Sequence, residues 1–486
     1  MKLFPGGQIP AWVYGVPLLL IFFFLSLGGY DLSAPDEPRF ALVAKEMLEA
    51  GHWILPHRND QPYPDKPPLL FWLIAGFSAL INSGEVSALT ARLPSALSAA
   101  WAVGLLWNWV RRTGGGQLTA HLTAGVLMSS FLFFYEARMA QIDMLLCALT
   151  TTAVVLGYHS LTGRPRPLAL GCCLGLGILA KGPVGYLVPA GALGLFALFR
   201  GQGTWRKYPW QALLWGLLPP LLWLGTLLSV VAAQGQWDYF VNLVIKQTVT
   251  RAINPWHHLQ PFYYFGVTLL HDFLPWTPFL LLALPWRKTQ RRALKDPEKL
   301  AWAVVLFTLV FFSLSKGKRN IYILPAFPFA AYLAAGRLTM LFNRGNWSRA
   351  EKCAACLPAI AFLLAGIGLL AAARGLLPAA IARNIDTLIH GIPDPPPLSA
   401  LGLGGAALLI CGLVALSGVW RSHGGRFVGG SLVGMAAGVL LVYGALLPWI
   451  GPYRSGRHFM EQASAIIAAE SRQPVVGMIQ YRSAFR

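Results

Sequence analysis

Long apolar segments recur along this chain, and this recurrence limits its possible folds more than any other feature. A helix needs about 20 apolar residues to cross the hydrocarbon core of a bilayer. Of the 486 residues, 56% are hydrophobic and 12% are charged, and the mean hydropathy is +0.54, which is typical of polytopic membrane proteins. We therefore predict an all-α fold with about thirteen membrane spans. The expected spans are residues 11–29, 90–110, 118–135, 140–161, 167–180, 183–199, 210–233, 262–286, 300–315, 321–336, 353–373, 398–419 and 428–450.

The basic residues indicate how these spans are oriented. They gather in every second loop, most densely in residues 287–299, which is the pattern of cytoplasmic loops. This assignment requires that residues 67–82, which are apolar but short and begin with two prolines, lie in the membrane interface without crossing it. Residues 1–450 then form one transmembrane domain. Its first long loop, residues 30–89, faces the periplasm, as does a short C-terminal tail, residues 451–486.

The net charge of +20 raises the question of nucleic-acid binding. Nucleic-acid-binding proteins concentrate their basic residues in a patch or stripe, and those that stack bases add exposed aromatic side chains. The basic residues of this chain instead lie in short clusters between apolar segments. We therefore expect membrane lipids as partners and no nucleic acid.

The first outer loop concentrates charged residues that the rest of the chain avoids. Residues 30–67 hold seven of the 19 acidic residues. Residues 36–49 place apolar side chains on one helical face, which predicts a short helix on the membrane surface. Asp36 and Glu37 fall at the positive end of this helix, which favours their ionised form. Either carboxylate is a candidate general base, and a simple helix cap is the alternative.

The motif Tyr63-Pro64-Asp65-Lys66-Pro67-Pro68 follows in the same loop. Its prolines stiffen the backbone around Asp65 and Lys66. A cation held where lipid meets water is suited to binding a phosphate as a compact point charge. A lysine that only extends from the membrane edge into water is the alternative.

Further ionisable residues are expected at the same outer face. Asp143 falls within an apolar segment, where ionisable groups are costly and usually functional. A pair between Asp143 and Arg138 is the alternative. Lys181 is expected in an outer hairpin, and Lys316 belongs to an outward basic cluster that suggests an anionic ligand. Arg251 adds another candidate in the next outer loop.

These motifs resemble those of a known family. Pro35-Asp36-Glu37-Pro38-Arg39 and the Tyr63–Pro68 motif resemble the first periplasmic loop of the lipid A aminoarabinose transferases. More broadly they resemble the bacterial GT-C glycosyltransferases related to protein O-mannosyltransferases. Further matches lie in consistent order within residues 10–340, at Ala91–Ser95, Ala137–Met139 with Asp143, Ala180–Pro183, Pro275–Thr277, Ser315–Lys316 and Tyr322–Pro325.

The resemblance implies a GT-C fold and an inverting sugar transfer from a polyprenyl-phosphate donor at the periplasmic face of the bacterial inner membrane. It implies that Asp36 is the main catalytic carboxylate, and we add Glu37 and Asp143 as catalytic candidates. Candidate residues for the donor phosphate and the substrate are Arg39, Tyr63, Asp65, Lys66, Arg138, Lys181, Arg251, Lys316 and Tyr322. Asp65 stands where the family often has Glu.

Several alternatives stay open at this point. Lipid A is the first candidate acceptor, and a protein or a polysaccharide of the cell envelope is the second. A lipid or sugar transporter without chemistry is the rival class, although transporters hold their ionisable groups near the membrane midplane and often show inverted repeats. The sequence makes no cofactor certain and leaves metal dependence open, with Asp36, Glu37 and Asp65 as candidates for holding a divalent metal.

Overall fold

The computed structural model describes residues 17–244, 259–286, 288–379 and 395–455, with a few isolated positions besides. In chain order its elements are η1 Leu20–Phe24, α2 Asp36–Ala50, β1 His57–Arg58, β2 Gln61–Pro62, α3 Leu69–Ile81, α4 Ala88–Arg112, α5 Gly116–Ser129, α6 Phe131–Ala137, α7 Ile142–Leu161, α8 Pro167–Lys181, α9 Val184–Arg200, η2 Gln202–Lys207, α10 Trp210–Gln234, α11 Trp237–Val241, α13 Tyr264–Asp272, α14 Thr277–Leu282, α15 Lys288–Arg292, α16 Asp296–Leu314, η4 Asn320–Ala326, α17 Phe327–Arg344, α18 Arg349–Ala373, α20 Leu398–Trp420, α21 Gly424–Leu441, η5 Val442–Leu446 and α22 Leu447–Arg454. The predicted all-α polytopic membrane fold is confirmed.

The number of spans is lower than predicted within the described residues. Eight helices are long and apolar enough to cross a membrane, or nine if α5 and α6, bent by 69°, form one broken span. The predicted spans 167–180 and 183–199 are the shorter helices α8 and α9. The predicted span 262–286 is split into α13 and α14 around Pro275, because proline lacks the N–H that a continuous helix needs. The predicted span 11–29 is described only in part.

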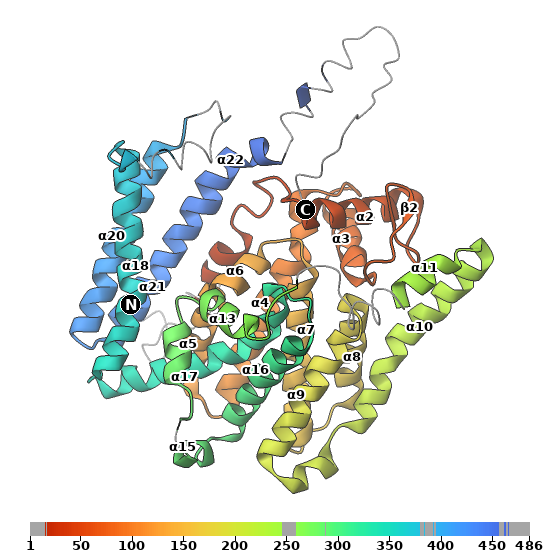
Figure 1. The fold of residues 1–486 in the computed structure, drawn as a ribbon, viewed down its shortest axis with the longest axis horizontal. Coiled ribbons are helices and arrows are strands. Elements are labelled where there is room, and N and C mark those ends of the chain that lie inside the picture. Colours follow the sequence, from red (N-terminus) through yellow and green to blue (C-terminus); the bar gives the residue numbers. More distant parts are fainter. Residues whose placement is uncertain are drawn as a thin grey trace, which may run out of the picture.

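The central core lies among α4, α7 and α17. Trp109 of α4 is 1% exposed. Its ring packs edge-on against Tyr158 of α7 and Tyr332 of α17, with centroids 5.5 Å apart in both pairs. Figure 1 shows α18, α20 and α21 on one side of this centre and α8 to α11 on the other. Aromatic packing of this kind gives the candidate site a rigid support.

The first long loop caps one end of the bundle. The predicted surface helix is α2, which begins at Asp36, ends at Ala50 and is followed by Gly51 at φ +75°. Its apolar face packs on α3, where Phe40 meets Phe71 with ring centroids 5.8 Å apart. Residues 69–81 form α3, a helix of 13 residues, which is shorter than the about 20 residues that a span needs. In Figure 1, α2, α3 and β2 lie at the end of the bundle opposite α15.

The hairpin of α8 and α9 depends on close backbone contact between two glycines. A Cβ atom built on Gly185 would lie 2.1 Å from the carbonyl oxygen of Gly177. The turn between the helices uses Gly182 at φ +75°, a conformation that L side chains rarely adopt. This hairpin fixes Lys181, the last residue of α8, at the end of the bundle that carries α2.

We expect Gly185→Ala to destabilise the protein by about 1–3 kcal/mol, because the added methyl group overlaps the backbone of α8. The measurement is thermal unfolding in detergent. Gly104→Ala is the matched control, since a Cβ there meets no atom within 4 Å. The control should be neutral or slightly stabilising. An equal melting temperature for Gly185→Ala and the wild type would contradict the close approach of α8 and α9.

Candidate functional site

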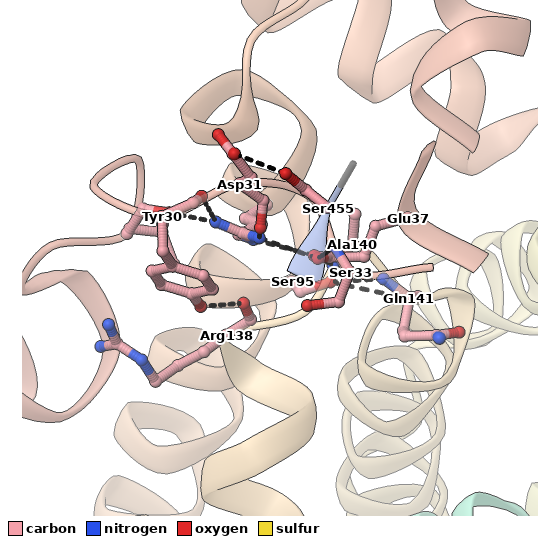
Figure 2. Close-up of polar contacts among 11 residues, drawn as sticks. Tyr30, Asp31, Ser33, Glu37, Ser95, Arg138, Ala140, Gln141 and Ser455 are labelled. Carbon is pink, nitrogen blue, oxygen red and sulfur yellow. Dashed lines mark hydrogen bonds and ion pairs between the residues drawn. The ribbon is translucent and has the colours of Figure 1, made fainter. Parts of the chain in front are cut away.

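A fully buried ion pair between Glu37 and Arg92 anchors the start of α2. Arg92 Nε and Nη2 donate to the two carboxylate oxygens of Glu37, each at 2.8 Å, and both side chains are 0% exposed. The backbone N–H groups of Ser33 and Ala140 also donate to Glu37, each at 2.7 Å. Figure 2 shows Glu37 between the segment that carries Ser33 and the turn that carries Ala140. Four charge-assisted hydrogen bonds fix this carboxylate in place.

The other donors of Arg92 bind the chain that leads into α2. Nη1 donates to the carbonyl oxygens of Leu27 and Tyr30, each at 2.9 Å, and Nη2 donates to that of Asp31 at 2.8 Å. The guanidinium also lies 3.8 Å from the centroid of the Tyr30 ring. All five N–H groups of Arg92 are therefore used. Glu37, a predicted catalytic residue, occupies a position suited to holding the site together.

Arg138, a predicted substrate-binding residue, has a similar supporting position. It is 0% exposed. Its Nη1 donates to the carbonyl oxygen of Phe22 at 3.0 Å, its Nη2 donates to that of Leu25, and its guanidinium lies 3.9 Å from the Tyr443 ring centroid. The Tyr30 hydroxyl donates to the Arg138 carbonyl oxygen at 3.1 Å (Figure 2). These contacts tie the turn after α6 to the first segment of the chain.

Asp36 is the carboxylate at which distant segments converge. It is 5% exposed and is the first residue of α2. Arg39, one turn further along the same helix, donates from Nη2 to its Oδ1. Its Oδ2 accepts from Gln141 Nε2 and Arg319 Nη2, both at 3.1 Å. Two guanidinium groups and an amide thus hold a charged carboxylate in one orientation.

A second group joins three of the predicted site residues. Lys181 Nζ, at the end of α8, donates to Oδ1 of Asp143 in the first turn of α7. The Asp143 side chain is 6% exposed and that of Lys181 is 14% exposed. The same ammonium lies 4.5 Å from the ring centroid of Tyr322 in η4. The alternative pair of Asp143 with Arg138 is wrong, because each of these residues binds other partners.

The Tyr63–Lys66 motif lies between α2, α3 and α11. Tyr63 is 3% exposed, and the guanidinium carbon of Arg58 lies 5.3 Å from its ring centroid. The Tyr239 hydroxyl of α11 donates to the Tyr63 carbonyl oxygen at 3.4 Å. Burial, and then the nearby Asp65 carboxylate, raises the pKa of Tyr239, so this hydroxyl stays a hydrogen-bond donor. Asp65 and Lys66 are half-buried in the turn before α3.

The outward basic cluster divides into residues with different positions. Lys316 is exposed. Lys318 is 4% exposed, and its Nζ donates to the carbonyl oxygens of Gln260, at 3.0 Å, and Ser315. Burial lowers the pKa of the Lys318 ammonium. Arg319 is the member of this cluster that contacts Asp36, whereas the predicted ligand Arg251 lies outside the described residues.

The three carboxylates proposed for a metal do not form such a group. Across the described ranges, no three His, Cys, Asp or Glu side chains converge as a metal site requires. Both oxygens of Glu37 are taken up by Arg92 and by backbone N–H groups. The prediction that Asp36, Glu37 and Asp65 together bind one metal ion is therefore wrong.

Sequence reasoning did not assign roles to Arg92, Gln141 or Glu136. Arg92 lies within an otherwise apolar helix, and a buried guanidinium there requires a partner. Gln141 precedes α7 and comes two residues before Asp143. Glu136 lies in α6, six residues before α7 begins. Each was visible as a polar residue in an apolar setting, but its partners were not.

Three comparisons with known proteins bear on this arrangement. The family described as dolichyl-phosphate-mannose-protein mannosyltransferase matches residues 65–223. A relative from Enterobacter sp. (strain 638), named undecaprenyl phosphate-alpha-4-amino-4-deoxy-L-arabinose arabinosyl transferase, is 30% identical over 68% of this chain and 60% of its own length. A relative of the same name, numbered 1, from Pseudomonas fluorescens is 31% identical over 68% of this chain and 62% of its own. The matches thus cover about three fifths of the relatives' length.

The fold has a solved counterpart. The crystal structure of ArnT from Cupriavidus metallidurans bound to undecaprenyl phosphate aligns with a TM-score of 0.72 at 22% identity. The alignment covers 97% of this chain and 84% of that one. The predicted resemblance to the GT-C group of aminoarabinose transferases and protein O-mannosyltransferases is confirmed by these findings together.

We expect Glu37→Gln to destabilise the protein by about 3–5 kcal/mol, because it leaves the buried Arg92 guanidinium without its counter-charge. Thermal unfolding and the yield of monodisperse protein in detergent measure the effect. Glu49→Gln is the control on the same helix, since Glu49 is 61% exposed and forms only a surface pair with Lys45. A Glu37→Gln protein as stable as the control would show that the pair is not the anchor of α2.

Proposed function

We propose, from this kinship with the GT-C glycosyltransferases, that the chain is an inverting transferase that takes its sugar from a polyprenyl phosphate. The observation that carries the proposal is the Asp36 carboxylate, which Arg39, Gln141 and Arg319 hold in one orientation. A group with fixed charge and direction, buried where a membrane loop covers the bundle, is suited to act on one bound substrate.

In the proposed reaction, an oxygen of the acceptor attacks the anomeric carbon of the donor sugar from the side opposite the phosphate. The carbon–oxygen bond to the phosphate breaks as the new one forms, and the electron pair leaves with the polyprenyl phosphate. Lys66 lies in the loop where that phosphate would meet water, and its cation stabilises the leaving charge. Such electrostatic stabilisation contributes several kcal/mol to typical transfer reactions.

The role of Asp36 depends on the acceptor. A hydroxyl acceptor carries a proton, which Asp36 takes as general base, an effect of about 10²–10⁴-fold. A phosphate acceptor such as that of lipid A arrives already ionised, and Asp36 then orients the donor sugar. Transfer of aminoarabinose to lipid A is our first candidate, because curated relatives are named for this sugar. A protein or polysaccharide acceptor is the second, because the mannosyltransferase family matches residues 65–223.

We place the protein in the bacterial inner membrane with Asp36 toward the periplasm. The support comes from charge. The strongly basic segment 288–299, which includes α15, lies at the end of the bundle opposite α2 (Figure 1). Basic loops stay in the cytoplasm, so the end that carries α2 lies outside.

We expect Asp36→Asn to lower transfer by at least about 10²-fold while the protein remains folded, because the variant loses either the general base or the charge that orients the donor sugar. The assay is purified protein in detergent with a labelled polyprenyl-phosphate sugar and a lipid A acceptor, followed as a new labelled product. Detergent abolishes gradients, so a transporter would give no product. Glu49→Gln is the control and should keep its activity. A fully active Asp36→Asn protein would refute the assignment.

The orientation has its own test. Asn59, in the turn between β1 and β2, is exposed, as is Thr289 of α15. We expect Asn59→Cys to react with a membrane-impermeant maleimide in intact spheroplasts, in a background without the six native cysteines. Thr289→Cys should react only after lysis. The reverse pattern would place the site in the cytoplasm and leave the proposed donor on the wrong side.

A further inference from the structure

One buried carboxylate, an electrostatic neighbour of Asp143, has no part in the transfer described above. Glu136 of α6 is 2% exposed. Within the described residues, its Oε2 is buried and has no hydrogen-bond partner. Buried polar groups in native proteins are nearly always paired, so an orphaned carboxylate oxygen points to a missing partner.

The charged groups around Glu136 are already engaged with one another. Its electrostatic neighbours are Asp143, Arg319, Lys181 and Glu37. The Lys181 ammonium binds Asp143, and the Arg319 guanidinium binds Asp36. Each cation of this set thus has another carboxylate as its partner. The Oε2 atom of Glu136 therefore has room for one hydrogen bond from a cation, and no described residue provides it.

We propose that Glu136 binds the ammonium group of an amino sugar on the donor. This inference rests on the proposed function and names the part of the site that selects the sugar. An ammonium brings three N–H donors and a full positive charge. A hydroxyl at the same place brings one donor and no charge. Hydrogen bonds between two ionised groups are about twice as strong as neutral ones, so the pair would favour the amino sugar.

Asp36 is less suited to this task. Its two oxygens already accept from Arg39, Gln141 and Arg319. An ammonium placed against Asp36 would compete with two guanidinium groups. The geometry therefore separates two roles, with Asp36 acting at the reacting centre and Glu136 reading a substituent of the sugar ring.

The test compares two donors that differ in one group. They are polyprenyl-phosphate 4-amino-4-deoxyarabinose and polyprenyl-phosphate arabinose. We expect the wild type to prefer the amino donor in kcat/KM. In Glu136→Gln this preference should fall roughly ten- to a hundredfold, because a neutral amide replaces the counter-charge. Glu49→Gln should keep the wild-type preference.

The outcomes separate the two proposals. A wild-type preference in a folded, active Glu136→Gln protein would overturn the role of Glu136 and leave the transferase standing. Absence of transfer from either donor by the wild type would overturn aminoarabinose as the donor sugar and this inference with it. If Glu136→Gln does not fold, Glu136→Asp replaces it. Glu136→Asp keeps the negative charge on a side chain that is one methylene shorter. We expect it to lose less of the preference for the amino donor than Glu136→Gln would.

Discussion

The structure depends on the buried ion pair of Glu37 with Arg92. Removing two charges from water costs several kcal/mol per ion, and only near-complete hydrogen bonding offsets this. Here all five N–H groups of the guanidinium and both carboxylate oxygens are used. The pair joins α2 to α4, to the first segment of the chain and to the turn before α7. Because Asp36 directly precedes Glu37 in the chain, the Glu37–Arg92 pair also sets the position of the Asp36 carboxylate.

The adjacent carboxylates of Asp36 and Glu37 therefore have different surroundings, which the sequence alone does not distinguish. Successive residues of a helix point about 100° apart, so Asp36 and Glu37 face different surroundings. Glu37 faces the Arg92 guanidinium and is fully enclosed. Asp36 faces Gln141 and Arg319, which belong to other segments of the chain. In the sequence both are carboxylates at the start of the same helix, so sequence alone makes both of them catalytic candidates.

Local features were predictable and long-range ones were not. The start of α2, the short α3, and the positions of Asp143 and Lys181 followed from apolar periodicity, prolines and charges out of place in apolar segments. The contact between Arg319 and Asp36 spans 283 residues of sequence, and no local pattern encodes it. The number of spans is also hard to predict from sequence, because hydropathy does not show whether an apolar segment forms one long helix or breaks and packs within the bundle.

Charge balance limits how such a site can handle a phosphate. In a medium of low dielectric constant, carboxylates and cations near one another pair before any ligand arrives, as Lys181 does with Asp143 and Arg319 with Asp36. A cation that already pairs with a carboxylate stabilises a new negative charge less than an unpaired cation would. In the proposed transfer the leaving phosphate is assigned to Lys66, which is half-buried in the turn before α3. In the two proposals above, the buried carboxylates of Asp36 and Glu136 act on the sugar, so opposite charges would recognise the two ends of the donor.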